Sequence, residues 1–164
     1  MTIASIKEIK NALNQHTALE LSDICIRLAK YKLENKELLH YLLFESRREA
    51  DYIESIKAKL AEQFAGINNS HAYFVKKSVR KIIRTAHRYA RYSNDECTAI
   101  ELWIYVAGQC QLLLQPFGNN PSLQKIQASL VQKIKKAIIN LHPDLQYDYH
   151  QKLKYLGLDK TLLE

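Results

Sequence analysis

Apolar residues recur every three to four positions along nearly the whole chain, and strict alternation of apolar and polar residues is absent over any useful length. The first spacing places apolar side chains on one face of a helix, whereas alternation would indicate a strand. Connections between the periodic segments are short, which favours antiparallel neighbours. The pattern therefore predicts an all-α fold, with about eight helices in an irregular stack of antiparallel helical hairpins around one buried central helix.

Capping residues and helix stop signals divide this pattern into separate helices. Candidate N-caps are Ser22, Asn35, Asn94 and Asn120, and candidate stops are Gly66 and Gly157. The expected helices cover roughly residues 2–14, 22–32, 36–44, 47–65, 70–92, 94–115, 121–141 and 143–157. Only four glycines and three prolines occur, and no Ser-, Pro- or Gly-rich linker divides the chain. We therefore expect one helical domain spanning residues 1–164.

The most apolar stretch covers residues 99–116, which approaches the length that spans a bilayer. It includes Glu101 and three glutamines and lacks basic anchors on both sides. Apolar residues surround nearly its whole circumference, a pattern typical of a helix covered by others. We interpret this stretch as the central core helix, with Trp103 buried and no membrane partner.

The cysteines and the N-terminal segment bear on the compartment. Cys25, Cys97 and Cys110 are scattered and form no C-x-x-C pair. Such thiols behave as small apolar groups in a reducing environment. Residues 1–21 carry charges among their apolar positions, unlike a secretory signal. We expect a cytoplasmic protein.

Charge is concentrated in one segment of the chain. The sequence has 24 Lys and Arg against 17 Asp and Glu, and no acidic residue occurs between Glu62 and Asp95. Seven basic residues fall in that interval: Lys76, Lys77, Arg80, Lys81, Arg84, Arg88 and Arg91. On a helix they share an arc of roughly 140°, opposite an apolar arc of roughly 120°. The segment 70–92 is therefore expected to be a core-packed helix with a positive outer face.

A positive face can contact a polyanion or can simply be solvated, as most charged helix faces are. The functional interpretation is contact with the phosphates of RNA or DNA, because Lys and Arg neutralise backbone charge and release counterions. Tyr73 and His87 lie on the same arc and offer stacking surfaces. An acidic protein is the alternative partner, since the same charges serve either purpose.

The seventh expected helix is also basic. It carries Lys125, Lys133, Lys135 and Lys136, and no acidic residue occurs between Glu101 and Asp144. The two basic helices form one surface if they pack side by side, and two solvated faces if they point apart. The sequence leaves both arrangements open.

Candidate catalytic and metal-binding sets are sparse. Glu37 and His40 have the Glu-x-x-His spacing of di-iron bundles, but the second such motif is missing. His142, Asp144, Asp148 and His150 cluster near a helix start, where Asp144 fits a first-turn acid. No glycine-rich phosphate loop or nucleophile motif is present. We expect no cofactor, no metal and a non-enzymatic binding or scaffold module.

Two resemblances accompany this interpretation. Arg80, six intervening residues and His87 resemble the Arg-x4-6-His motif of HEPN-type ribonucleases, which are small all-helical proteins. The resemblance implies a ribonuclease in which His87 transfers a proton and Arg80 stabilises phosphorane charge. Lys81 stands where that family typically has Asn, Asp or His. The segments 34–45, 73–84 and 144–149 also resemble a group of bacterial all-helical proteins of unknown function, which implies no activity or site residues.

Overall fold

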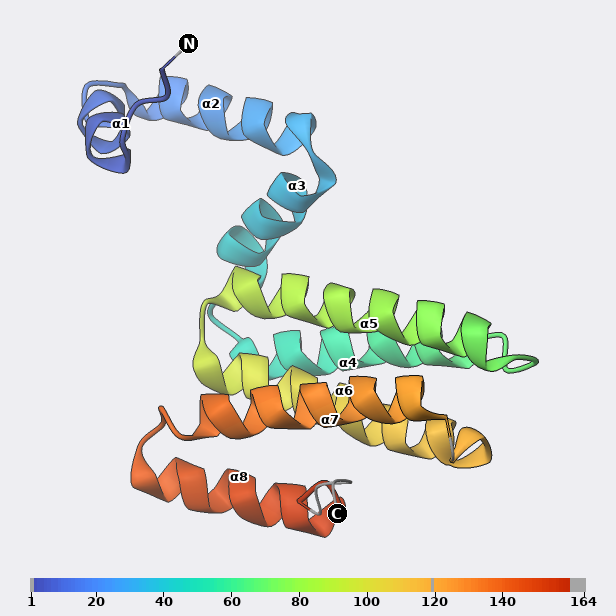
Figure 1. Ribbon diagram of the computed structural model, residues 1–164. Helices are drawn as coiled ribbons and strands as arrows, with labels where there is room; N and C mark the ends of the chain where they lie inside the picture. Colours follow the sequence, from blue (N-terminus) through green and yellow to red (C-terminus); the bar gives the residue numbers. More distant parts are fainter. Residues whose placement is uncertain (1, 119, 160–164) are drawn as a thin grey trace. The chain divides into compact units, whose positions relative to one another are not determined.

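A computed structural model describes residues 2–118 and 120–159 (Figure 1). Over these residues the chain forms α-helices and no strands, which confirms the all-α fold. The α-helices are α1 (Ile6–Leu13), α2 (Ala18–Tyr31), α3 (Leu33–His40), α4 (Glu49–Ala65), α5 (Ala72–Ser93), α6 (Glu96–Leu114), α7 (Pro121–Ile138) and α8 (Pro143–Tyr155). A π-helical turn, η1 (Tyr41–Glu45), follows α3, and a 3-10 turn, η2 (Gln115–Phe117), follows α6.

The contacts of the chain fall into two compact units, Met1–Glu45 and Ser46–Glu164. The first unit holds α1 to α3 and η1, and the second holds α4 to α8. The single folding domain expected from the sequence, which would include both units, stays a prediction.

Capping boxes define the start of the first two helices. The Ser5 hydroxyl accepts from the Glu8 amide at 3.3 Å, while the Glu8 carboxylate accepts from the Ser5 amide at 2.7 Å. Thr17 and Glu20 form the same arrangement at the start of α2. The expectation that Ser22 caps this helix was wrong, because the Thr17 box satisfies the free amides one turn earlier.

The first unit buries little of its own apolar surface. None of the described residues of α1, α2 or α3 is buried, although α1 has a clear apolar face. Ile3, Ile6 and Tyr31 are more than three quarters exposed. The third helix begins after Lys32 and not at the expected Asn35 cap; the Asn35 amide instead donates to the Leu28 carbonyl at 2.9 Å.

The core of the second unit is built around α6, which packs against α4, α5 and α7. Figure 1 shows these helices side by side with their directions alternating along the chain. Residues of α6 that are fully buried include Ile100, Leu102 and Ile104. Glu96–Phe117 is also long and apolar enough, by length and composition, to cross a membrane. Of its most apolar window, 39% is buried within the unit.

Polar contacts fix the helices of this unit against one another. The Tyr52 hydroxyl on α4 donates to the Tyr89 carbonyl on α5 at 2.9 Å. The buried Gln127 amide on α7 donates to the Ala107 carbonyl on α6 at 2.9 Å. A buried polar group is costly unless it is paired, so each bond favours one register of its helix pair.

The turn between α5 and α6 differs from the sequence expectation by one residue. Asn94 has the left-handed backbone conformation, with φ of 55°, and ends α5. Asp95 is the N-cap of α6, and its carboxylate accepts from the Thr98 amide at 2.9 Å. The prediction that Asn94 is the N-cap of α6 was therefore wrong. Asn120 was correct: its side chain accepts from the Ser122 and Leu123 amides at the start of α7.

Candidate functional site

Helices α5 and α7 lie on opposite sides of a groove in the second unit. A hollow of about 540 Å³ between them is lined from α5 by Lys76, Arg80, Ile83 and His87. From α7 it is lined by Ser122, Lys125, Ile126, Ser129, Leu130 and Lys133. The basic residues of the two helices therefore border one concave surface, which we call the α5–α7 groove.

The groove is polarised along its length. Because α6 runs antiparallel to both neighbours, α5 and α7 run in the same direction and begin at the same end (Figure 1). Aligned peptide dipoles leave partial positive charge at a helix N-terminus, so the two dipoles add to the charge of Lys76 and Lys125 there. Neither helix carries an Asp or Glu, so no carboxylate of α5 or α7 offsets this charge.

A second hollow, of about 680 Å³, extends the groove over α5. It is lined by Tyr73, Lys76, Lys77, Arg80, Ile83, Arg84 and His87. Six of the nine residues singled out from the sequence thus border the same surface. Lys76, Arg80 and His87 belong to both hollows and connect them.

The other three predicted residues lie outside these two hollows. Lys81 is exposed on α5 and borders neither of them. Arg88 is half-buried, with its guanidinium carbon 5.3 Å from the centroid of the Tyr89 ring, a cation–π geometry. Arg91 is exposed and borders a smaller hollow of about 380 Å³ together with Asp95 and Glu96.

The lysines of α7 divide in the same way. Lys125 and Lys133 border the groove. Lys135 instead pairs with Asp159, its ammonium lying 3.1 Å from the carboxylate. Lys136 is exposed and lines neither hollow. Of the four lysines singled out on α7, two therefore border the groove that α7 shares with α5.

His87, Trp103 and Lys133 form a cluster at the far end of the groove. The rings of His87 and Trp103 meet edge to face, with centroids 5.3 Å apart. The Lys133 ammonium lies 4.3 Å from the Trp103 centroid. Trp103 is half-buried, so the expectation of full burial was wrong; its ring lies against His87 and Lys133.

This cluster keeps His87 neutral. Burial, together with the positive charges of Lys133 and Arg91, lowers the pKa of His87 from 6.5 to about 4. Burial also lowers the pKa of the Lys133 ammonium. His87 therefore contributes no positive charge to the groove near neutral pH. Its buried Nε2 has no hydrogen-bond partner within the described part of the chain.

Sequence reasoning missed the two serines of the groove and the position of Trp103 beside it. Ser122 and Ser129 line the α5–α7 hollow and supply hydroxyl donors. Their spacing of seven residues places them on one face of α7 with Lys125 and Lys133. That spacing was visible in the sequence, but nothing in it identified α5 as the neighbour.

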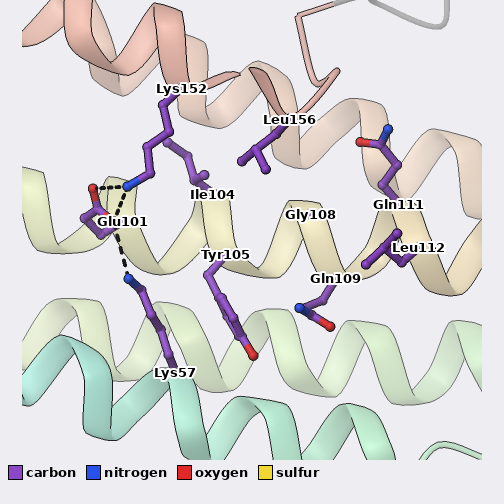
Figure 2. Close-up of a pocket in the computed structure, with 10 residues that line it drawn as sticks. All are labelled: Lys57, Glu101, Ile104, Tyr105, Gly108, Gln109, Gln111, Leu112, Lys152 and Leu156. Carbon is purple, nitrogen blue, oxygen red and sulfur yellow. Dashed lines mark hydrogen bonds and ion pairs between the residues drawn. The ribbon is translucent and has the colours of Figure 1, made fainter. Parts of the chain in front are cut away.

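A separate pocket of about 290 Å³ lies between α4, α6 and α8 (Figure 2). At one end Glu101 accepts from Lys152 at 2.6 and 2.7 Å and lies 3.5 Å from the Lys57 ammonium. Figure 2 shows the two lysines reaching Glu101 from opposite sides. The remaining lining is mainly apolar, and its charges are already paired. This end of the pocket ties three helices together.

The two residue sets that the sequence analysis considered for a metal ion form no ligand set in the described part of the chain. Over the described residues, no three His, Cys, Asp or Glu side chains are grouped so that they can hold a metal ion. His40 lies 3.3 Å from Glu45, and His142, the N-cap of α8, lies 3.4 Å from Asp144, which stands two residues after it.

No protein-family model, curated protein or solved structure matches the chain.

Proposed function

We propose that the protein is a non-enzymatic binding module whose α5–α7 groove contacts a polyanion, namely the backbone of a nucleic acid. The observation that carries this proposal is that basic side chains from two separate helices converge on one groove whose helices carry no acidic residue. Lys and Arg contacts to phosphates position a protein on nucleic acid without reading bases, so little sequence preference is expected. The free, scattered cysteines support a cytoplasmic location.

The composition of the groove favours phosphate over a carboxylate partner. Arg80 can donate two parallel hydrogen bonds to one phosphate, and Ser122 and Ser129 add hydroxyl donors. Because the groove runs along two parallel helices, its charges are spread in a line, as a chain of phosphates requires. An acidic protein remains the alternative partner, which the experiment below distinguishes.

The environment of His87 supports binding over ribonuclease chemistry. Proton transfer is most efficient when the pKa of the catalytic group lies near the working pH. With a pKa of about 4, His87 carries no proton to donate at neutral pH and is a weak base. Arg80 and His87 do border the same hollows, but their proximity is explained by two helical turns on one face.

The first prediction concerns the charges of the groove. The double variant Arg80→Glu/Lys125→Glu should lose binding to a short RNA or DNA, because two of the four cations that line the hollow between α5 and α7 become anions. The wild type should show a log affinity that falls with log salt at a slope of roughly −3 to −4, as expected for about four phosphate contacts. Fluorescence anisotropy with labelled oligonucleotides at several salt concentrations measures both quantities.

The matched control is Lys81→Glu/Lys136→Glu, which makes the same charge change on the same two helices outside the hollows. It should retain most of the affinity. Equal loss in both double variants would contradict a localised groove. Polyglutamate binding as tightly as an oligonucleotide of equal charge would favour the acidic-protein alternative instead.

A further inference from the structure

Exposed aromatic side chains lie at the end of the groove where α5 begins. Tyr73 is 63% exposed and borders the same hollow as Lys76, Lys77 and Arg80. Phe74 beside it is 46% exposed, and the two rings meet edge to face with centroids 5.6 Å apart. Exposed rings beside phosphate-binding cations provide faces on which unpaired bases stack.

The charges of this site line a concave surface. Lys76, Arg80, Lys125 and Lys133 border the hollow between α5 and α7 and do not form a protruding ridge. The bases of duplex DNA are read by elements that protrude into its major groove, such as a helix. A positively charged groove that follows one backbone, with aromatic rings beside it, is the arrangement that binds single strands.

From these observations we propose that the α5–α7 groove binds single-stranded nucleic acid, with a base stacked on Tyr73 and the phosphates lying along the basic residues. This inference rests on the proposed function and specifies its ligand. The sugar–phosphate backbone of the bound nucleic acid occupies the hollow between α5 and α7. The base on Tyr73 has to be free of a complementary strand, because a paired base has both faces covered by its neighbours in the duplex.

The length of the bound strand follows from the helix. Tyr73 and His87 are fourteen residues apart on α5, which corresponds to about 21 Å along the helix axis. A stacked strand advances about 3.4 Å per nucleotide, so the groove accommodates about six nucleotides. Beyond His87 the neighbouring hollow is bordered by Asp95 and Glu96 as well as by Arg91 and Lys133, so carboxylates offset its positive charge and weaken the attraction for further phosphates. The footprint therefore ends there.

The test compares three probes on the full chain: single-stranded oligonucleotides of three to twelve nucleotides, the same sequences as duplexes, and inorganic polyphosphate. Single-strand affinity should rise with length up to about six nucleotides and exceed duplex affinity at least about tenfold at the same salt concentration. Tyr73→Leu, which keeps an apolar side chain but removes the ring, should weaken single-strand binding about fivefold or more. It should leave the salt slope and polyphosphate binding unchanged, because no charge is removed.

Two variants serve as controls. Tyr73→Phe keeps the stacking surface and should retain single-strand affinity. Tyr147→Leu removes an equally exposed ring, 65% exposed, from α8 and should have no effect.

The results separate the two proposals. Equal or tighter duplex binding, or unchanged single-strand affinity in Tyr73→Leu, overturns the single-strand inference, while loss of binding in Arg80→Glu/Lys125→Glu still supports the polyanion groove. If the charge reversal leaves binding unchanged as well, both proposals fail.

Discussion

His87 shows how one residue responds to its surroundings in the folded chain. Its imidazole packs on Trp103 and lies near Lys133 and Arg91, and burial comes first among the causes that lower its pKa to about 4. In the unfolded chain the same group has its ordinary pKa near 6.5. The folded state therefore binds this proton more weakly than the unfolded state does.

This difference predicts a pH-dependent stability. The contribution of neutral His87 is fully present above pH 6.5 and is lost as the pH falls toward 4, because protonation then favours the unfolded chain. We expect about 1 kcal/mol of the free energy of unfolding to depend on His87, a value reduced for the partial solvation of the ring. Urea unfolding at pH 7 and pH 4.5, on wild type and His87→Gln, measures it. If the two proteins lose equal stability on acidification, His87 is not the responsible group.

At the scale of the helix, α6 contains a glycine, Gly108, that neither close packing nor backbone conformation requires. Gly108 lies in the interior of α6 with helical backbone, and a Cβ added there meets nothing within 4 Å. Gly157, just after α8, has φ of +66°, a conformation that L side chains rarely adopt. The two glycines differ in kind although the sequence presents both as single breaks in helical patterns.

Substituting alanine at each position should therefore have opposite effects. Gly108→Ala should stabilise the protein by about 0.5–1 kcal/mol, because alanine restricts the unfolded chain and has space in the folded one. Gly157→Ala should destabilise it by about 1 kcal/mol, because the left-handed conformation crowds a Cβ. Thermal unfolding followed by circular dichroism should show shifts of a few degrees in opposite directions. A lower melting temperature for Gly108→Ala would show that the space beside it is not open.

At the scale of the whole molecule, the core belongs to one part of the chain. Among the described residues, every buried hydrophobic side chain except Tyr41 lies in Ser46–Glu164. The first 45 residues form helices with capping boxes but bury no residue in α1, α2 or α3. Helices of this length are marginal in water without tertiary packing.

A fragment comprising residues 46–164 should accordingly fold alone. It should keep a single cooperative unfolding transition and the oligonucleotide affinity of the full chain, since α5 and α7 are both present. A peptide of residues 1–45 should show little helical circular dichroism, because a unit this small rarely stabilises itself. Failure of residues 46–164 to fold would instead support the single domain expected from the sequence.

Local interactions determined what was readable from the sequence. The helical period and the Asn120 cap depend on residues within a few positions of one another, so they follow from spacing alone. The wrong predictions at Ser22, Asn35 and Asn94 are also local. Each of these side chains is suited to capping, but the helix begins at a different residue. The clearest case is α2, where Thr17 and Glu20 form a reciprocal capping box.

Tertiary structure alone decided which of these local features combine. Lys125 and Lys133 face Lys76 and Arg80 only because α6 returns the chain so that α5 and α7 lie parallel. The same packing places Lys135 beside Asp159, outside the groove. It also encloses His87 against Trp103 and so lowers its pKa. These outcomes depend on contacts between residues far apart in the chain, and helical periodicity carries no information about which faces meet.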